Sequence, residues 1–176
     1  GGFPELDAQP DIDARGFFES YVATYLERDL RIQLQVGSLR DFERFLRAAA
    51  LRTAQLLNRA ELSRDVGISP STAGQWLSVL ERSGIVGLLE PWYSNRTKAL
   101  VKTPKLHFHD TGLCAFLMGV DSAGELRGSP FSGALWETMV YSEIHRLLAS
   151  EAGTWQLAYW RDRTKEADFL LHKGGR

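Results

Sequence analysis

The chain lacks the features that define several large classes of protein. Its 176 residues include one cysteine, Cys114, which excludes an internal disulfide and a cysteine-rich zinc site and fits a reducing compartment. No stretch approaches the roughly 20 apolar residues that a membrane span requires. The first residues, GGFPEL, have neither the regions of a signal peptide nor an initiating methionine. The sequence therefore predicts a cytoplasmic protein with no membrane partner, cut from a longer chain at both ends.

The net charge of −1 is distributed unevenly along the chain. Residues 1–38 carry 3 basic and 7 acidic residues, and residues 106–176 carry 7 basic and 9 acidic residues. Residues 39–105 carry 11 basic and 6 acidic residues, which gives this third a net charge of +5. An acidic partner would therefore be attracted to the middle of the chain.

Apolar residues recur at three- and four-residue intervals in two early stretches. This spacing predicts helices over residues 16–34 and 39–57.

The stretch NRAELSRDVGISPSTAGQWLSVLERSG predicts two helices joined by a tight turn. Asn58 can cap the first helix, and Gly67 can end it in a left-handed conformation. Ser69 can cap the second helix, with Pro70 in its first turn. A strand over 85–89, a loop over 91–98 and a return strand over 99–103 follow. The pattern is that of a helix-turn-helix with a β-hairpin, which is a winged helix.

The remaining residues predict a second structural unit. A short strand over 106–108 precedes a helix that Asp110 caps and that runs to about residue 118. Residues 120–130 have the composition of a linker. A strong helix over 132–150 then leads to strands over 155–160 and 165–171.

Six ordered blocks resemble one protein family: GGFPE, YLERDL, GISPSTAGQWLSVLE, PKLHFHDTGL, GALWETMVYSEI and YWRDRTKEADFLL. The chain resembles the C-terminal part of bacterial and archaeal AAA-type ATPases of unassigned function. The resemblance implies an upstream ATPase domain as a partner, then a winged helix, then a nuclease-like domain of the PD-(D/E)xK type. ATP and Mg²⁺ are expected only for the full-length parent, because this chain has no G-x-x-x-x-G-K-[ST] motif.

We therefore expect an α+β fold, mainly helical, in four parts. These are a helical connector over 1–38, a winged helix domain over 39–119, a linker over 120–130 and a partial nuclease-like unit over 131–176.

In the nuclease-like family that the chain resembles, a helix supplies one acidic residue and a strand supplies another. Carboxylates are hard oxygen ligands and hold Mg²⁺ beside a phosphate. Glu137 or Glu143 would be the helix acid and Asp168 the strand acid, with Glu137 and Asp168 as metal ligands. Glu166 lies two positions before Asp168 and so on the same strand face. The (E/D)xK strand of the resemblance would follow Gly174 and Gly175, so we expect no catalysis by this chain. The alternative is that these acids are ordinary surface residues.

For nucleic acid, the second helix of the helix-turn-helix would direct its polar residues at base edges, and the wing would grip phosphates. No lysine or arginine occurs from Gly67 through Glu81, so the wing would supply the charge. The alternative is a winged helix that packs against protein only. The candidate contacts are Ser71, Thr72, Gly74, Gln75, Ser78, Trp92, Tyr93, Asn95, Arg96, Lys98, Lys102 and Lys105.

Three hypotheses of function follow. The first is a non-catalytic module that binds double-stranded DNA weakly. The second is a protein-interaction or oligomerisation module that couples the ATPase to partners, with self-association through the edge of the strand over 165–171. The third, a Mg²⁺-dependent nuclease, concerns the full-length parent alone. His107, His109 and Asp110 lack a further ligand at zinc-site spacing, and Cys114 lies on an apolar helix face.

Overall fold

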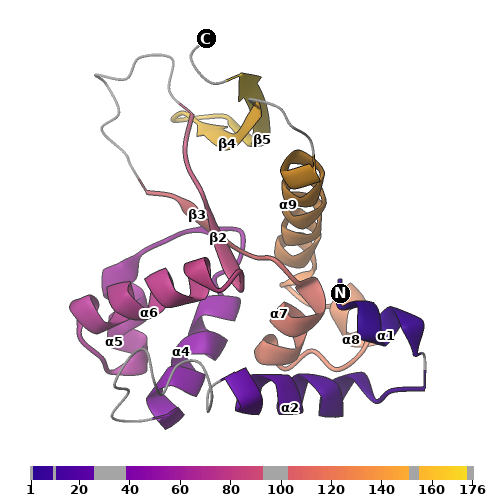
Figure 1. Cartoon of the computed structure of the whole chain (residues 1–176). Coiled ribbons are helices and arrows are strands. Elements are labelled where there is room, and N and C mark those ends of the chain that lie inside the picture. The colour runs from indigo at the N-terminus through magenta and orange to yellow at the C-terminus, as the bar shows by residue number, and fades with distance from the viewer. Residues whose placement is uncertain (1, 10, 26–38, 93–102, 151–154, 174–176) are drawn as a thin grey trace.

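Short antiparallel strands connect a mainly helical body to a protruding hairpin in an α+β fold (Figure 1). The structure is a computed structural model, and it describes residues 2–9, 11–25, 39–92, 103–150 and 155–173. In chain order its elements are α1 (Pro4–Ala8), α2 (Ala14–Tyr25), α4 (Leu39–Ala50), β1 (Gln55–Leu56), α5 (Arg59–Val66), α6 (Pro70–Arg82), β2 (Val86–Leu89), β3 (Lys105–Phe108), α7 (Thr111–Met118), α8 (Ala123–Arg127), α9 (Ser132–Ser150), β4 (Trp155–Arg161) and β5 (Glu166–Lys173).

The first sheet has β3 at its centre, with β1 and β2 antiparallel on either side. All four residues of β3 are buried. Because successive side chains of a strand point to opposite faces, Leu106 and Phe108 enter the main core, while Lys105 and His107 face α9 and β5. This strand therefore separates an apolar interior from a polar one.

The main apolar core joins α4, α5, α6 and α7. Phe42 and Phe45 of α4 meet the ring of Trp76 edge to face, with ring centroids 5.1 and 5.3 Å apart. Each such pair contributes roughly 1 kcal/mol beyond the burial of its area. These contacts fix one face of α6 and leave its other face to solvent.

The turn between α5 and α6 is fixed by local chemistry. The side chain of Asn58 accepts a hydrogen bond from the Glu61 amide, and Ser69 accepts one from the Thr72 amide. Gly67 has φ of 82°, a left-handed conformation that a side chain resists. The predicted caps and the predicted turn are confirmed.

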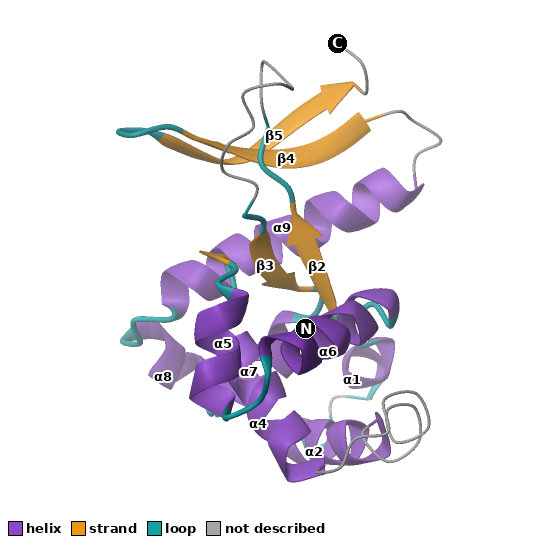
Figure 2. Ribbon diagram, turned by 90° about the vertical axis from the view of Figure 1, so that its left-hand side faces the viewer, coloured by secondary structure: helices purple, strands orange, loops and turns teal. Residues whose placement is uncertain are grey.

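Helix α9 and the hairpin β4–β5 lie beside the first sheet (Figure 2). The outer edge of β4 is covered by residues 90–92, through hydrogen bonds that join Tyr159 to Glu90 and Trp92. A small second core of Leu89, Tyr141 and Tyr159 holds the two parts together. Gly87 allows this approach, because any Cβ there would collide with the Tyr141 hydroxyl.

Three sequence predictions need correction. The helix predicted over 39–57 ends at Ala50, because the Ala54 amide bonds to Leu106 O at 2.7 Å and the chain enters β1. The partner of β2 is β3 at 105–108, which the sequence pattern suggested was a separate strand. The predicted linker contains α8, which Ser122 caps. Residues 26–34 of the first predicted helix and 99–102 of the return strand lie outside the described residues. No described helix is long and apolar enough to cross a membrane.

Candidate functional site

Three acidic side chains from two distant segments converge on the ammonium of Lys105. Nζ of Lys105 lies 2.9 Å from Glu137 on α9 and 2.6 Å and 3.0 Å from Glu166 and Asp168 on β5. The Lys105 side chain is 4% exposed, whereas those of Glu137, Glu166 and Asp168 are 19%, 32% and 54% exposed. The ammonium therefore lies at the bottom of the cluster, and Asp168 forms its solvent side.

The charges of this cluster stabilise one another. Burial by itself lowers the pKa of Lys105, but hydrogen bonds to the three carboxylates outweigh burial and raise the pKa above its ordinary value. Burial also raises the pKa of Glu137, and the contact with Lys105 offsets part of this rise. Lys105 is thus held as a cation, and its three N–H groups have one carboxylate each.

His107 borders the cluster on the same face of β3. Burial and the neighbouring charge of Lys105 lower the pKa of His107 to about 3, so the ring is neutral at pH 7. Its Nδ1 lies 3.4 Å from the Thr138 hydroxyl, which is 2.7 Å from the Thr53 hydroxyl. Its Nε2 is buried with no hydrogen-bond partner among the described residues, and it lies 3.8 Å from Oε1 of Glu137.

The predicted acids are only partly brought together. Glu137, Glu166 and Asp168 meet, whereas Glu143 pairs with Arg146 on the surface of α9. The Lys105 ammonium occupies the place at which Mg²⁺ would bridge the carboxylates, so Mg²⁺ does not fit the cluster as it stands. No group of three or more histidine, cysteine or acidic side chains within the described ranges is arranged to hold a metal ion.

The predicted DNA-contacting residues of α6 lie mostly on its exposed face. Ser71, Gln75 and Ser78 are exposed, and Thr72 and Gly74 are half-buried. The Thr72 hydroxyl is 2.8 Å from that of Ser69, so it belongs to the helix cap. Ser71, Gln75 and Ser78 make this exposed face polar, and the exposed charges of the helix, Glu81 and Arg82, lie at its end.

The prediction that Lys105 grips phosphate is wrong. Lys105 is buried by β5 and α9, and its charge is matched by carboxylates, so no polyanion can reach it. The other predicted wing residues Tyr93, Asn95, Arg96, Lys98 and Lys102 lie outside the described residues.

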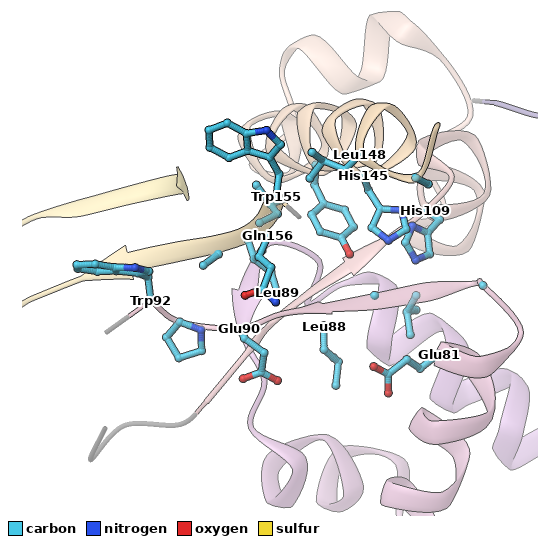
Figure 3. A pocket seen from close by; sticks show the side chains of 18 of the residues that line it. Glu81, Leu88, Leu89, Glu90, Trp92, His109, His145, Leu148, Trp155 and Gln156 are labelled. Carbon is cyan, nitrogen blue, oxygen red and sulfur yellow. The ribbon is translucent and has the colours of Figure 1, made fainter. Parts of the chain in front are cut away.

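A groove of about 1310 Å³ lies between the end of α6, β2, α9 and β4 (Figure 3). Trp92 and Trp155 line it, and the Trp92 amide donates to Tyr159 O, so the segment that follows β2 packs on the hairpin. His109 also lines the groove, where burial and the neighbouring His145 lower its pKa to about 4. These two histidines have ring centroids 4.6 Å apart.

Two further residues have structural roles. Asp110 caps α7 by accepting the Leu113 amide at 2.7 Å. Cys114 is fully buried, and burial raises the pKa of its thiol to about 12, so it is a core residue.

Sequence reasoning missed the roles of Lys105 and His107. One signal could have indicated them: polar residues at 105 and 107 alternate with the apolar Leu106 and Phe108. A buried strand with one polar face requires charged or hydrogen-bonding partners on that face. The sequence does not say which residues those partners are.

Comparisons with known proteins place the chain among uncharacterised families. Residues 132–176 match a model described as Domain of unknown function (DUF4143). The uncharacterized protein Rv2008c of Mycobacterium tuberculosis is 32% identical over 181 residues, which cover 100% of this chain and 40% of that protein. The uncharacterized protein Mb2031c of Mycobacterium bovis has the same identity and the same coverage. The chain thus spans about 40% of the length of these relatives.

No solved structure matches the chain. The model described as Domain of unknown function (DUF8612) matches residues 1–124, which is more than half of the chain. The chain therefore belongs to the DUF8612 family and continues into a segment similar to DUF4143.

Proposed function

We propose that residues 39–108 act as a winged-helix module that binds double-stranded DNA with α6 as its recognition helix. The order α4, β1, α5, α6, β2, β3 and the sheet order β1-β3-β2 support this interpretation. They match a helix-turn-helix followed by a wing.

One observation carries the proposal. Helix α6 buries Ala73, Trp76 and Leu77 on one side and exposes Ser71, Gln75 and Ser78 on the other. Glutamine and serine side chains can hydrogen-bond to base edges in the major groove. The exposed side is therefore suited to enter that groove, while the buried side holds the helix in place.

Two arginine side chains near α6 can contact the phosphate backbone of DNA. Arg64 at the end of α5 and Arg82 at the end of α6 are exposed. Neither has an ion-pair partner among the residues that the structure describes. Because Lys105 is buried, it adds no charge to the proposed DNA-binding surface. Few cations remain on that surface, so we expect weak and salt-sensitive binding of DNA.

The test is a titration of a labelled duplex at two salt concentrations. The wild-type chain binds at low salt and loses affinity at high salt. Gln75→Glu places a negative charge on the exposed face and should weaken binding about tenfold or more. Gln9→Glu makes the same change at the end of α1, on the opposite side of the molecule from α6 (Figure 1), and should have no effect. No binding even at low salt would remove this proposal.

A second candidate function, self-association, is favoured by the open edge of the hairpin. The outer edge of β5 has no strand partner among the described residues, whereas the outer edge of β4 is covered. Leu171 on β5 is 48% exposed. An open edge with exposed apolar side chains pairs readily with a second copy of the same strand.

Light scattering at high concentration tests this second candidate. Wild type should be a dimer, and Leu171→Lys should shift it to a monomer, because a lysine on the edge opposes pairing. Leu147→Lys alters a more exposed leucine on α9 and should leave the dimer intact. A wild-type chain that is monomeric at high concentration would contradict self-association through β5.

The relatives are longer than this chain, and the activity of such longer proteins is a separate proposal. By resemblance, an upstream AAA-type ATPase domain would use ATP and Mg²⁺, and a complete nuclease-like domain would follow. The meeting of Glu137, Glu166 and Asp168 supports a polar site in that domain. The test is whether a longer relative cleaves DNA with Mg²⁺ and loses cleavage when the acidic residue that corresponds to Asp168 of this chain is changed to its amide.

A further inference from the structure

The groove between α6, β2, α9 and β4 has a volume of about 1310 Å³, which is larger than most sites for a small ligand (Figure 3). A groove of this size accommodates a short segment of polypeptide chain. The side chains that line it therefore indicate which kind of segment it fits.

Two carboxylates line this groove without an ion-pair partner among the described residues. Glu81 at the end of α6 and Glu90 after β2 lie on either side of Leu88 (Figure 3). Partial burial and the negative charge of Glu81 raise the pKa of Glu90, and Arg59 offsets only part of this rise. The two carboxylates therefore favour a positive charge between them.

A buried hydroxyl at the same groove is a second observation, independent of the carboxylates. Tyr141 lines the groove although it is only 3% exposed. Its ring stacks on His107 with centroids 4.4 Å apart, but its hydroxyl, beside Gly87, has no hydrogen-bond partner within the described ranges. Because buried hydroxyl groups are usually hydrogen-bonded, this one is available to a ligand of the groove.

The indole rings of Trp92 and Trp155 also line the groove (Figure 3). The Trp155 ring already accepts a cation on its face, because the ammonium of Lys173 lies 5.1 Å from its centroid. Guanidinium groups stack on indole faces and bind carboxylates through paired N–H groups, whereas an ammonium has no plane to stack. The lining of the groove therefore favours arginine over lysine.

We propose that this groove binds an extended segment of a partner protein that carries an arginine. The guanidinium lies between Glu81 and Glu90, its aliphatic part packs on Leu88, and the Tyr141 hydroxyl donates to a backbone carbonyl of the segment.

Charge complementarity identifies this occupant. The two carboxylates of Glu81 and Glu90 and the one guanidinium of Arg82 give the lining a formal charge of −1, with its histidines counted as neutral. The same carboxylates repel phosphates, so nucleic acid does not fit the groove. The proposal rests neither on DNA binding by α6 nor on self-association through β5.

Fluorescence anisotropy with a short labelled peptide tests the site. The peptide has arginine at its centre and serine, threonine and glycine elsewhere, and the wild-type chain should bind it. Glu90→Gln removes one carboxylate and should weaken binding about tenfold. Tyr141→Phe keeps the ring that stacks on His107 and should weaken binding about fivefold. Glu5→Gln makes the same change as Glu90→Gln at an exposed position of α1 outside the groove, and it should bind as wild type does.

Three results would overturn the proposal. The first is no binding of the arginine peptide at about millimolar protein. The second is unchanged affinity in the double variant Glu81→Gln, Glu90→Gln, which should fold because both residues are exposed; circular dichroism checks this. The third is free arginine that binds as tightly as the peptide, which would make the groove a small-molecule site.

Light scattering examines the remaining occupant, a second copy of this chain. If the wild-type chain forms a dimer that the double variant breaks, a second copy fills the groove and the proposed partner is wrong. If the double variant leaves the oligomeric state unchanged and loses the peptide, the arginine segment is supported.

Discussion

At the residue scale, β3 buries two polar side chains that the chain supports in different ways. Lys105 is satisfied by three carboxylates from other elements. His107 contacts the Thr138 hydroxyl, and its Nε2 has no hydrogen-bond partner within the part of the chain that the structure describes. Burial of a protonatable ring in its neutral form links folding to pH, because the unfolded chain binds a proton that the folded chain excludes.

The stability of the protein should therefore fall in mild acid. The pKa of His107 is lowered to about 3 in the folded chain and is about 6.5 when the chain is unfolded. The stability of the folded chain with neutral His107 is fully present above pH 6.5, and it is lost progressively as the pH falls toward 3. Between pH 7 and pH 5 this residue should cost about 2 kcal/mol of unfolding free energy.

Urea unfolding at pH 7, 6 and 5 measures the effect. The asparagine of His107→Asn can hydrogen-bond to Thr138 but cannot titrate in this range. The variant should therefore lose about 2 kcal/mol less unfolding free energy than wild type between pH 7 and pH 5. Equal slopes for wild type and the variant would show that the folded chain accepts a proton on His107.

At the element scale, the starts of helices α5, α6 and α7 depend on short signals that are visible in the sequence. Asn58, Ser69 and Asp110 each cap a helix as predicted, because each accepts an amide hydrogen bond three residues ahead. Such bonds involve neighbours in the chain, so they can be predicted without knowledge of the fold. The end of α4 could not be predicted in this way, because the residue that draws Ala54 out of the helix is Leu106 on a distant strand.

Two glycine substitutions test the turn before α6 and the interior of α6 separately. Gly67→Ala should destabilise the protein by about 1 kcal/mol, because a side chain resists the left-handed conformation at this turn. Gly74→Ala lies inside α6, where a new Cβ has no neighbour within 4 Å, and should stabilise the protein by up to about 1 kcal/mol.

Midpoints of denaturant unfolding for the two variants should move in opposite directions. A higher midpoint for Gly67→Ala would mean that the backbone of the turn is not the one described, and a lower midpoint for Gly74→Ala would contradict the open space around that residue. The Gly74 variant also shows whether added helix stability changes the DNA binding that we propose, because this residue borders the exposed face of α6.

At the scale of the whole molecule, two cores of unequal size are joined by polar contacts. The main core gathers helices of the N-terminal two-thirds. Among the described residues, the second core buries Leu89, Tyr141 and Tyr159, with Leu56, Leu157 and Phe169 partly buried against them. The hairpin β4–β5 thus relies on few buried apolar residues and on Lys105. Segments of this kind open more readily than a main core.

Lys105→Met should loosen the hairpin selectively. The variant leaves Glu137 and its neighbours without their cation, and breaking a buried ion pair typically costs about 3 kcal/mol or more. The exposure of Asp168 reduces this cost, so we expect about tenfold faster hydrogen exchange in β4 and β5, with little change in α4 and α6.

Hydrogen exchange followed by mass spectrometry distinguishes this outcome from general destabilisation. Glu143→Gln removes a carboxylate of α9 that pairs with Arg146 at the surface, and its exchange pattern should match wild type. Equal acceleration in all elements of Lys105→Met would contradict a local role for the cluster.

The sequence predicts the acidic residues of the cluster but does not predict that Lys105 lies among them. The pairing of Glu166 with Asp168 follows from their spacing on a strand, and the approach of Glu137 follows from the family resemblance. The sequence analysis places Lys105 among the phosphate contacts of the predicted wing, whereas the structure buries it. Its partners lie 32 to 63 residues further along the chain, and no local pattern indicates contacts of that range.

The central position of β3 has a consequence for how the chain is made. A ribosome releases residue 105 long before residues 137, 166 and 168, so the nascent chain can close its apolar core while the lysine ammonium still lacks every partner. Until β5 emerges, water or a chaperone must solvate that charge. The polar face of the first sheet therefore becomes complete only when β5, which is synthesised after β3, has emerged.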